Sequence, residues 1–180
     1  MNTISFEERV RRIVGLDLEP IKFKIVHDYR ESGWTIDRVT QAESLYKRYL
    51  VLTVKHQDCL LVPTGDIDDF WHHHILDTAK YQRDCQYALG FFLHHFPYSG
   101  LLDDSDAKQQ KANFERTQEL WLREFGEPLS SVAADCKDCG PIFDCDGGGG
   151  DSEPTPTHNP NAEHPLGLTR RRPTLELLRQ

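Results

Sequence analysis

The 180-residue sequence lacks a surplus of basic side chains. Its 21 Lys and Arg are outnumbered by 29 Asp and Glu, so the formal net charge is −8 at pH 7. No basic face can be traced through residues 1–128, and the one basic run is Arg170–Arg172. Polyanions are held mainly by lysine and arginine. The composition therefore argues against nucleic acid as a partner and leaves a protein or a small molecule.

Long apolar runs are also missing. No stretch approaches the roughly 20 apolar residues that a membrane-spanning helix needs. The first residues, MNTISFEERVRRIV, contain no continuous apolar segment of the kind found in a signal peptide. We therefore expect a cytoplasmic protein with no membrane partner.

The five cysteines are an odd number, which in a chain without an export signal favours thiols or metal ligands over a disulfide framework. Cys136 and Cys139 form a C-x-x-C pair, and Cys145 follows it. A C-x-x-C turn is the usual half of a zinc or redox site, so these three residues are a weak second candidate for metal binding. The alternative is a flexible tail with reduced thiols, because one pair is only half of a site and the flanking DGGGGD lacks the geometry of a zinc knuckle. A thioredoxin-like motif is not expected, because no βαβ pattern surrounds the pair.

Helical periodicity dominates the first two thirds of the chain. Ser5 and Glu8 form a capping box, Pro20 suits a first helical turn, Thr35 can cap a third helix, and Gly126 can end the last one. The pattern predicts an all-α fold, an irregular bundle of five or six helices, in a domain at 1–128. Residues 129–180 are rich in Cys, Gly and Pro and are predicted to be a flexible, disordered tail.

Potential chemistry is concentrated in Gly65–Gly100, which holds five of the nine histidines. We expect one helix from about Asp66 to a bend near Gly90, followed by a short helical segment that ends at Pro97. Imidazole and carboxylate ligands suit Zn or non-haem Fe. The candidate metal ligands are His72, His74, Asp77, Asp84, His94 and His95, and the candidate pocket residues are Trp71, Tyr81, Cys85 and Tyr98.

Two interpretations of this stretch compete. In the first, His74 and at least one of His94 and His95 converge on a metal in a pocket walled by Trp71 and Tyr81. In the second, the histidines are hydrogen-bonded core residues, with Asp77 or Asp84 orienting an imidazole or capping the next segment. The second describes an interaction module for a protein or peptide with no catalysis. The sequence names no reaction under either interpretation.

Three segments also carry a family resemblance: VPTGDIDDFWHHHILDTAKYQRDC, ALGFFLHHFPYSG and LDLEPIKFKI, with GWT upstream. Over about residues 16–126 the chain resembles the bacterial glycine-rich domain-containing protein-like family, which shares a domain with plant glycine-rich domain proteins. The resemblance implies a shared domain and no particular activity. By position, the family motif falls on Trp71, His72, His74, Leu76, Tyr81, Asp84, Cys85, His94, His95 and Pro97.

Overall fold

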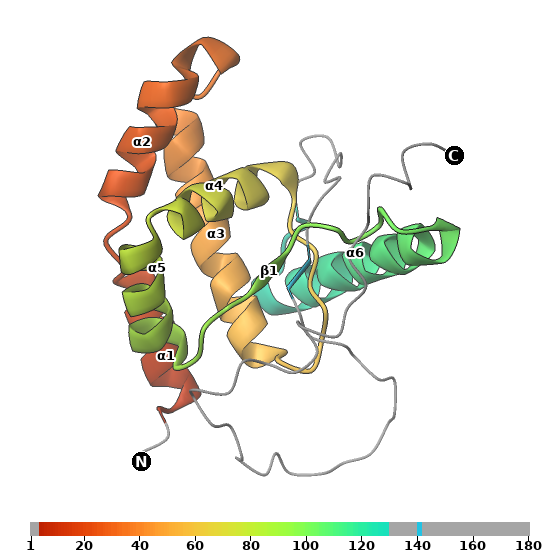
Figure 1. The fold of residues 1–180 in the computed structure, drawn as a ribbon. Coiled ribbons are helices and arrows are strands. Elements are labelled where there is room, and N and C mark those ends of the chain that lie inside the picture. The colour runs from red at the N-terminus through yellow and green to blue at the C-terminus, as the bar shows by residue number, and fades with distance from the viewer. Residues whose placement is uncertain (1–3, 130–139, 142–180) are drawn as a thin grey trace.

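The computed structural model describes residues 4–129 and 140–141, and six α-helices make up most of this part of the chain (Figure 1). The only strands in it are two short ones, β1 (His95–Phe96) and β2 (Gly140–Pro141), which pair antiparallel. The predicted all-α bundle of five or six helices is therefore confirmed. The helices are α1 (Phe6–Val14), α2 (Glu19–Tyr29), α3 (Ile36–Lys55), α4 (Gly65–Leu76), α5 (Thr78–Asp84) and α6 (Asp104–Phe125).

Most helix ends follow the capping signals of the sequence. The Oγ of Ser5 accepts a hydrogen bond from the Glu8 amide at 3.2 Å, and the Oγ1 of Thr35 accepts one from the Arg38 amide at 3.1 Å. Gly126 ends α6 with φ 71°, a left-handed conformation that glycine adopts without strain. These local hydrogen bonds satisfy amides and carbonyls that helix ends leave without intrahelical partners.

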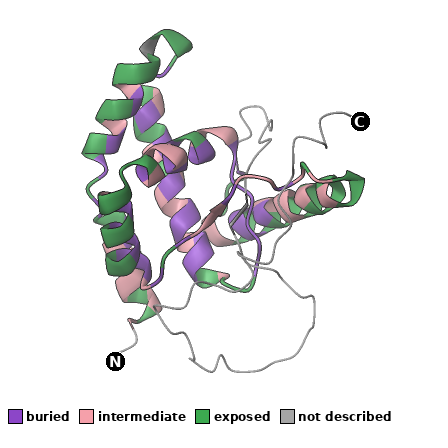
Figure 2. Cartoon of the chain, viewed as in Figure 1, coloured by how far each residue is buried: buried purple, intermediate pink, exposed green. Residues whose placement is uncertain are grey.

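Helix α3 is the centre of the bundle. Helices α1, α2 and α4 all pack against it, and Figure 1 shows α4 and the β1 segment passing across it. Its inward face includes Tyr46 and Tyr49, neither of which is exposed to solvent, and the buried residues in Figure 2 gather along this helix. Burial of this face against three other helices provides the hydrophobic stabilisation of the domain.

The helix predicted from Asp66 to Gly90 is interrupted at Asp77, so that part of the prediction is wrong. Asp77 has φ −83° and ψ 71°, outside the helical region, and its side chain accepts a hydrogen bond from the Lys80 amide as the N-cap of α5. A π-helical turn at Cys85–Leu89 follows α5, and Gly90 ends it with φ 82°. The bend predicted at Gly90 is confirmed, because that φ is one that a residue with a side chain rarely adopts.

The segment after Gly90 is extended, whereas the sequence analysis predicted a short helix there. Its end forms β1, in which His95 pairs with Pro141 and Phe96 with Gly140. Pro97 disfavours a helical conformation for the residue before it, which helps to explain the difference. Neighbouring side chains in an extended segment point to opposite sides, so His94 and His95 face different surroundings.

Two further predictions lie partly or wholly outside the described residues: the flexible tail at 129–180 and the candidate ligands Cys136, Cys139 and Cys145. Within the described part of the chain, no helix is both long and apolar enough to cross a membrane.

Candidate metal centre

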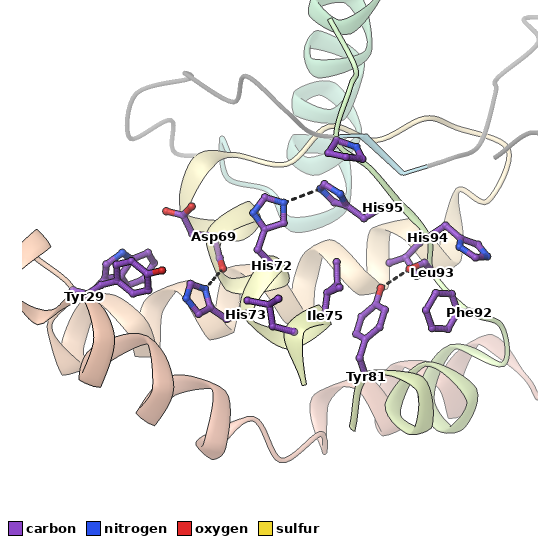
Figure 3. A pocket seen from close by; sticks show the side chains of 13 residues that line it. Tyr29, Asp69, His72, His73, Ile75, Tyr81, Phe92, Leu93, His94 and His95 are labelled. Atoms are coloured by element: carbon purple, nitrogen blue, oxygen red, sulfur yellow. Dashed lines mark hydrogen bonds between the residues drawn. The ribbon is translucent and has the colours of Figure 1, made fainter. Parts of the chain in front are cut away.

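The two histidine blocks of the sequence meet through His72 on α4 and His95 on β1. Their Nε2 atoms lie 3.0 Å apart, and a dashed line joins these two nitrogens in Figure 3. At this distance, at most one of the two Nε2 atoms can carry a proton. Either one donates to the other as N–H···N, or both lone pairs are directed at a shared cation.

Asp68, one helical turn before His72, adds a carboxylate to this pair. Its Oδ1 lies 3.5 Å from the His95 Nε2, and its Oδ2 lies 3.7 Å from the His72 Nδ1. The side chains of Asp68 and His95 are each 10% exposed, and that of His72 is 39% exposed. Among the described residues, Oδ1 of Asp68 is buried and has no hydrogen-bond partner. A buried carboxylate oxygen without a hydrogen bond is energetically costly. This atom would therefore be stabilised by a hydrogen-bond donor or by a cation.

Asp68, His72 and His95 together have the dimensions of a metal site. One donor atom from each residue lies within 4.8 Å of the other two. Donors about 2.1 Å from one ion, at angles of about 90–110°, are about 3.0–3.4 Å apart. The Nε2–Nε2 distance of 3.0 Å and the Oδ1–Nε2 distance of 3.5 Å are close to these values. Small movements of these side chains would bring all three donor atoms to the distances of a metal site.

Asp68 is not among the ligands predicted from the sequence. The available signal was the spacing of Asp68 and His72, because residues four apart share one face of a helix. The contribution of His95 could not be read in the same way, because it comes from a separate extended segment.

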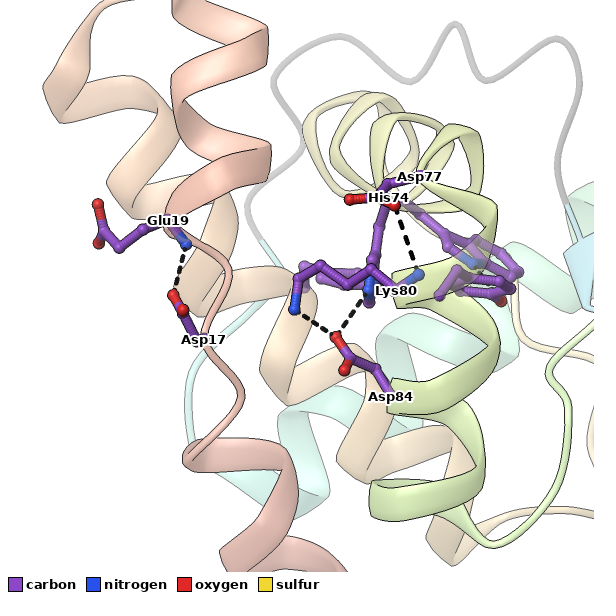
Figure 4. A network of polar contacts seen from close by, with 9 residues as sticks. Asp17, Glu19, His74, Asp77, Lys80 and Asp84 are labelled. Atoms are coloured by element: carbon purple, nitrogen blue, oxygen red, sulfur yellow. Dashed lines mark hydrogen bonds and ion pairs between the residues drawn. The ribbon is translucent and has the colours of Figure 1, made fainter.

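His74 is buried and belongs to a different cluster, which includes the partly buried Lys80 (Figure 4). Its Nε2 lies 3.1 Å from Oδ2 of Asp84, and its Nδ1 lies 3.0 Å from the Tyr46 hydroxyl. The Lys80 ammonium also contacts Oδ2 of Asp84, at 2.6 Å. Because a carboxylate accepts, Nε2 donates to Asp84, and Nδ1 then accepts from Tyr46. Both nitrogens of His74 are thus used.

Burial determines the protonation state of His74. Loss of solvent lowers its pKa from 6.5 to about 4, although the Asp84 carboxylate acts in the opposite direction. The imidazole is therefore neutral at pH 7. This arrangement corresponds to the core-histidine interpretation, with Asp84 orienting the ring and Asp77 capping the next helix.

The structure thus joins His95 to His72 and not to His74. Successive residues of a helix are rotated by about 100°, so positions two apart face nearly opposite directions. Trp71 and Tyr81 lie between the two clusters: the Trp71 indole donates to the Tyr81 hydroxyl at 2.9 Å. The Trp71 ring packs edge-on against His95, and the Tyr81 ring packs edge-on against His74. The same hydroxyl donates to the Leu93 carbonyl, just before His95.

The other candidate residues have separate roles. Asp77 is exposed and caps α5. His94 points away from the His72–His95 pair, beside Phe92 (Figure 3). Tyr98 packs edge-on against Phe96. Cys85 is a buried free thiol whose pKa is raised to about 11 by loss of solvent, so it is protonated and unreactive at pH 7.

A cavity of about 690 Å³ opens beside His72 and His95, both of which line it. Figure 3 shows that it extends from Tyr29 and His73 at one end to Phe92 at the other. An ion held by His72 and His95 would therefore lie in the wall of a cavity that can admit a ligand. The remaining lining residues are Trp34, Asp69, Ile75, Leu76, Tyr81, Leu93, His94 and Pro97.

Comparison with known proteins corrects the family expected from the sequence motifs. No curated protein and no solved structure matches the chain. Residues 8–124 match the model of a protein family described as UCP032817-like. The resemblance to glycine-rich domain-containing proteins is wrong, since nothing in this match indicates a glycine-rich domain. Because the match covers well over half of the 180 residues, the chain belongs to the UCP032817-like family.

Proposed function

We propose that this domain binds one divalent transition-metal ion, Zn²⁺ or Fe²⁺, through Asp68 Oδ1, His72 Nε2 and His95 Nε2. The observation that carries the proposal is the buried Oδ1 of Asp68, which lacks a hydrogen bond and lies 3.5 Å from the His95 nitrogen. A cation at this point would satisfy that oxygen and use both imidazole lone pairs. Metal binding would thereby remove the cost of a buried carboxylate oxygen that has no hydrogen bond.

The donor set indicates which ions are suitable. Two imidazoles and one carboxylate are the protein ligands of many catalytic zinc sites, and also of non-haem Fe²⁺ sites. Hard ions such as Mg²⁺ and Ca²⁺ prefer sites made only of oxygen. Three protein ligands leave at least one coordination position open, and the cavity beside His72 and His95 is where water or a ligand would reach it.

The second expectation from the sequence, an interaction module without metal, differs in one measurable respect. In that case His72 and His95 share a proton as a simple N–H···N pair, and Oδ1 of Asp68 stays without a hydrogen bond. Metal content therefore separates the two interpretations, because the cavity exists in both.

The test is metal analysis of the purified full chain, followed by titration of the metal-free chain with Zn²⁺ and, without oxygen, with Fe²⁺. One ion per chain is expected. Replacing a ligand by alanine in His72→Ala, His95→Ala or Asp68→Ala should weaken binding at least about 100-fold. His94→Ala is the matched control, since it removes a neighbouring imidazole of the same block that points away from the site. A chain that binds no ion, or triad variants that bind as tightly as His94→Ala, would instead support the metal-free module.

A further inference from the structure

The cavity beside the proposed metal is mainly apolar and aromatic. Its two ends are formed by ring pairs: Tyr29 packs edge-on against His73, and Phe92 packs edge-on against Tyr81. Leu76 lies at its rim with 76% of its surface exposed, and Tyr29 and Phe92 are also exposed. Large apolar side chains left in solvent around one concavity indicate a binding surface for apolar groups.

The polar side chains of the cavity are those of four histidines, two tyrosines, one Trp and one Asp. Among the described residues that line it, none is Lys or Arg, and none is Ser, Thr, Asn or Gln. Asp69 is the one carboxylate among the described residues that line the cavity. A phosphate or a second carboxylate would find no Lys or Arg side chain here and would face this acidic group.

We infer that the cavity binds an uncharged small molecule with an aromatic or branched aliphatic body, which gives one nitrogen or oxygen donor to the metal at Asp68, His72 and His95. This inference rests on the proposed metal site for the donor contact. The body of the ligand lies along the apolar floor between Tyr29 and Phe92. The volume of about 690 Å³ is within the range of roughly 300–1,000 Å³ typical of small-molecule sites.

The first arm of the test uses the full chain loaded with Co²⁺, a coloured substitute for Zn²⁺ or Fe²⁺. It is titrated with imidazole and with 4-phenylimidazole, and the visible spectrum reports coordination. The phenyl compound should bind at least about tenfold more tightly, because its ring is buried in the cavity. Equal affinities would overturn the inference and leave the metal site intact. A phenyl phosphate that binds more tightly than 4-phenylimidazole would overturn the choice of an uncharged ligand.

A pair of matched variants locates the effect. Phe92→Ala removes an exposed part of the cavity wall and should remove most of the advantage of 4-phenylimidazole over imidazole. Phe23→Ala removes an exposed aromatic side chain of α2 outside this cavity and should leave the advantage unchanged. If both variants behave alike, the phenyl ring does not bind where we infer.

The second arm separates the cavity from the metal. The neutral dye Nile red is titrated into the His95→Ala chain, which lacks one proposed ligand. Fluorescence enhancement that is lost when Phe92→Ala is added, and kept when Phe23→Ala is added, supports an apolar site even if no metal binds. Enhancement that is absent, or equal in all three chains, overturns it. The first arm therefore tests the ligand bound to the metal, and the second tests the apolar cavity without the metal.

Discussion

His72 and His74 are two residues apart on the same helix, yet they have opposite surroundings. His74 is buried, and each of its ring nitrogens has a fixed protein partner in Tyr46 and Asp84. His72 is 39% exposed, borders a cavity and faces the nitrogen of another imidazole. The first environment is complete without a ligand, whereas the second contains a buried carboxylate oxygen with no hydrogen bond.

This contrast shows which histidine cluster stabilises the fold and which is available for chemistry. A buried polar network in which each member is paired gives rigidity and leaves no donor or acceptor for another molecule. A cluster that contains a buried acceptor without a hydrogen bond, next to a cavity, lowers the stability of the fold. Binding of a ligand or ion to that acceptor would raise the stability. Each of the following predictions tests one side of this comparison.

The largest effect is expected from Asp84→Ala. This change leaves the buried Nε2 of His74 and the partly buried ammonium of Lys80 without their shared partner. Loss of one member of a buried charged network costs about 3–5 kcal/mol of unfolding free energy, which urea denaturation can measure. Asp77→Ala is the control and should cost about 1 kcal/mol, since it removes only an exposed helix cap. Similar costs for the two variants would contradict a structural role for the His74 cluster.

Acidification should lower the free energy of unfolding by nearly as much, through protonation of His74. The folded chain takes up this proton only near pH 4, whereas the unfolded chain takes it up near pH 6.5, so the unfolded state binds more protons between these values. The contribution to stability is complete above pH 6.5 and falls as the pH drops to 4, by about 3 kcal/mol. In His74→Gln, the pH dependence of the unfolding free energy should be shallower by that amount.

The exposed His27 provides the comparison for that experiment. His27→Gln makes the same substitution at an exposed position of α2 and is the matched control. If the two variants share one pH profile, the neutral buried state of His74 is not what makes the fold sensitive to acid.

Metal should stabilise the chain through the other cluster. An ion that binds only the folded state, at about 100 times its Kd, adds about 2.7 kcal/mol to the unfolding free energy. Thermal unfolding with Zn²⁺ and with EDTA measures this difference. The gain should vanish in His95→Ala and persist in His74→Gln. A gain that vanishes in His74→Gln instead would mean that the two clusters are not independent.

The smallest effect is expected where the two clusters meet. The Tyr81 hydroxyl accepts from Trp71 and donates to the Leu93 carbonyl, so it ties the segment that bears His95 to α4. Tyr81→Phe should cost about 1–2 kcal/mol of stability and weaken metal binding about tenfold, because it loosens the position of His95.

Tyr49→Phe removes another buried hydroxyl, one bonded to the Leu61 carbonyl. It should cost similar stability without changing metal affinity. Equal losses of affinity would assign the effect to general softening of the core.

The helices could be predicted because their signals are local. Ser5, Thr35 and Gly126 act on amides or carbonyls within a few residues of themselves, so the same contacts form in any tertiary context. The break at Asp77 could not be predicted in this way. Nothing in the local pattern distinguishes a carboxylate that caps a new helix from one on the surface of a continuing helix.

The sequence by itself determined an all-α domain, its main helix ends and the concentration of imidazoles and carboxylates between Gly65 and Gly100. These features depend on periodicity and composition, which act over a few residues. Only the tertiary structure decided that His95, with Asp68, joins His72 and that Asp84 joins His74. That choice depends on the break at Asp77 and on the extended path after Gly90. Both bring residues from separate segments together, and contacts between separate segments are set by the packing of the whole chain.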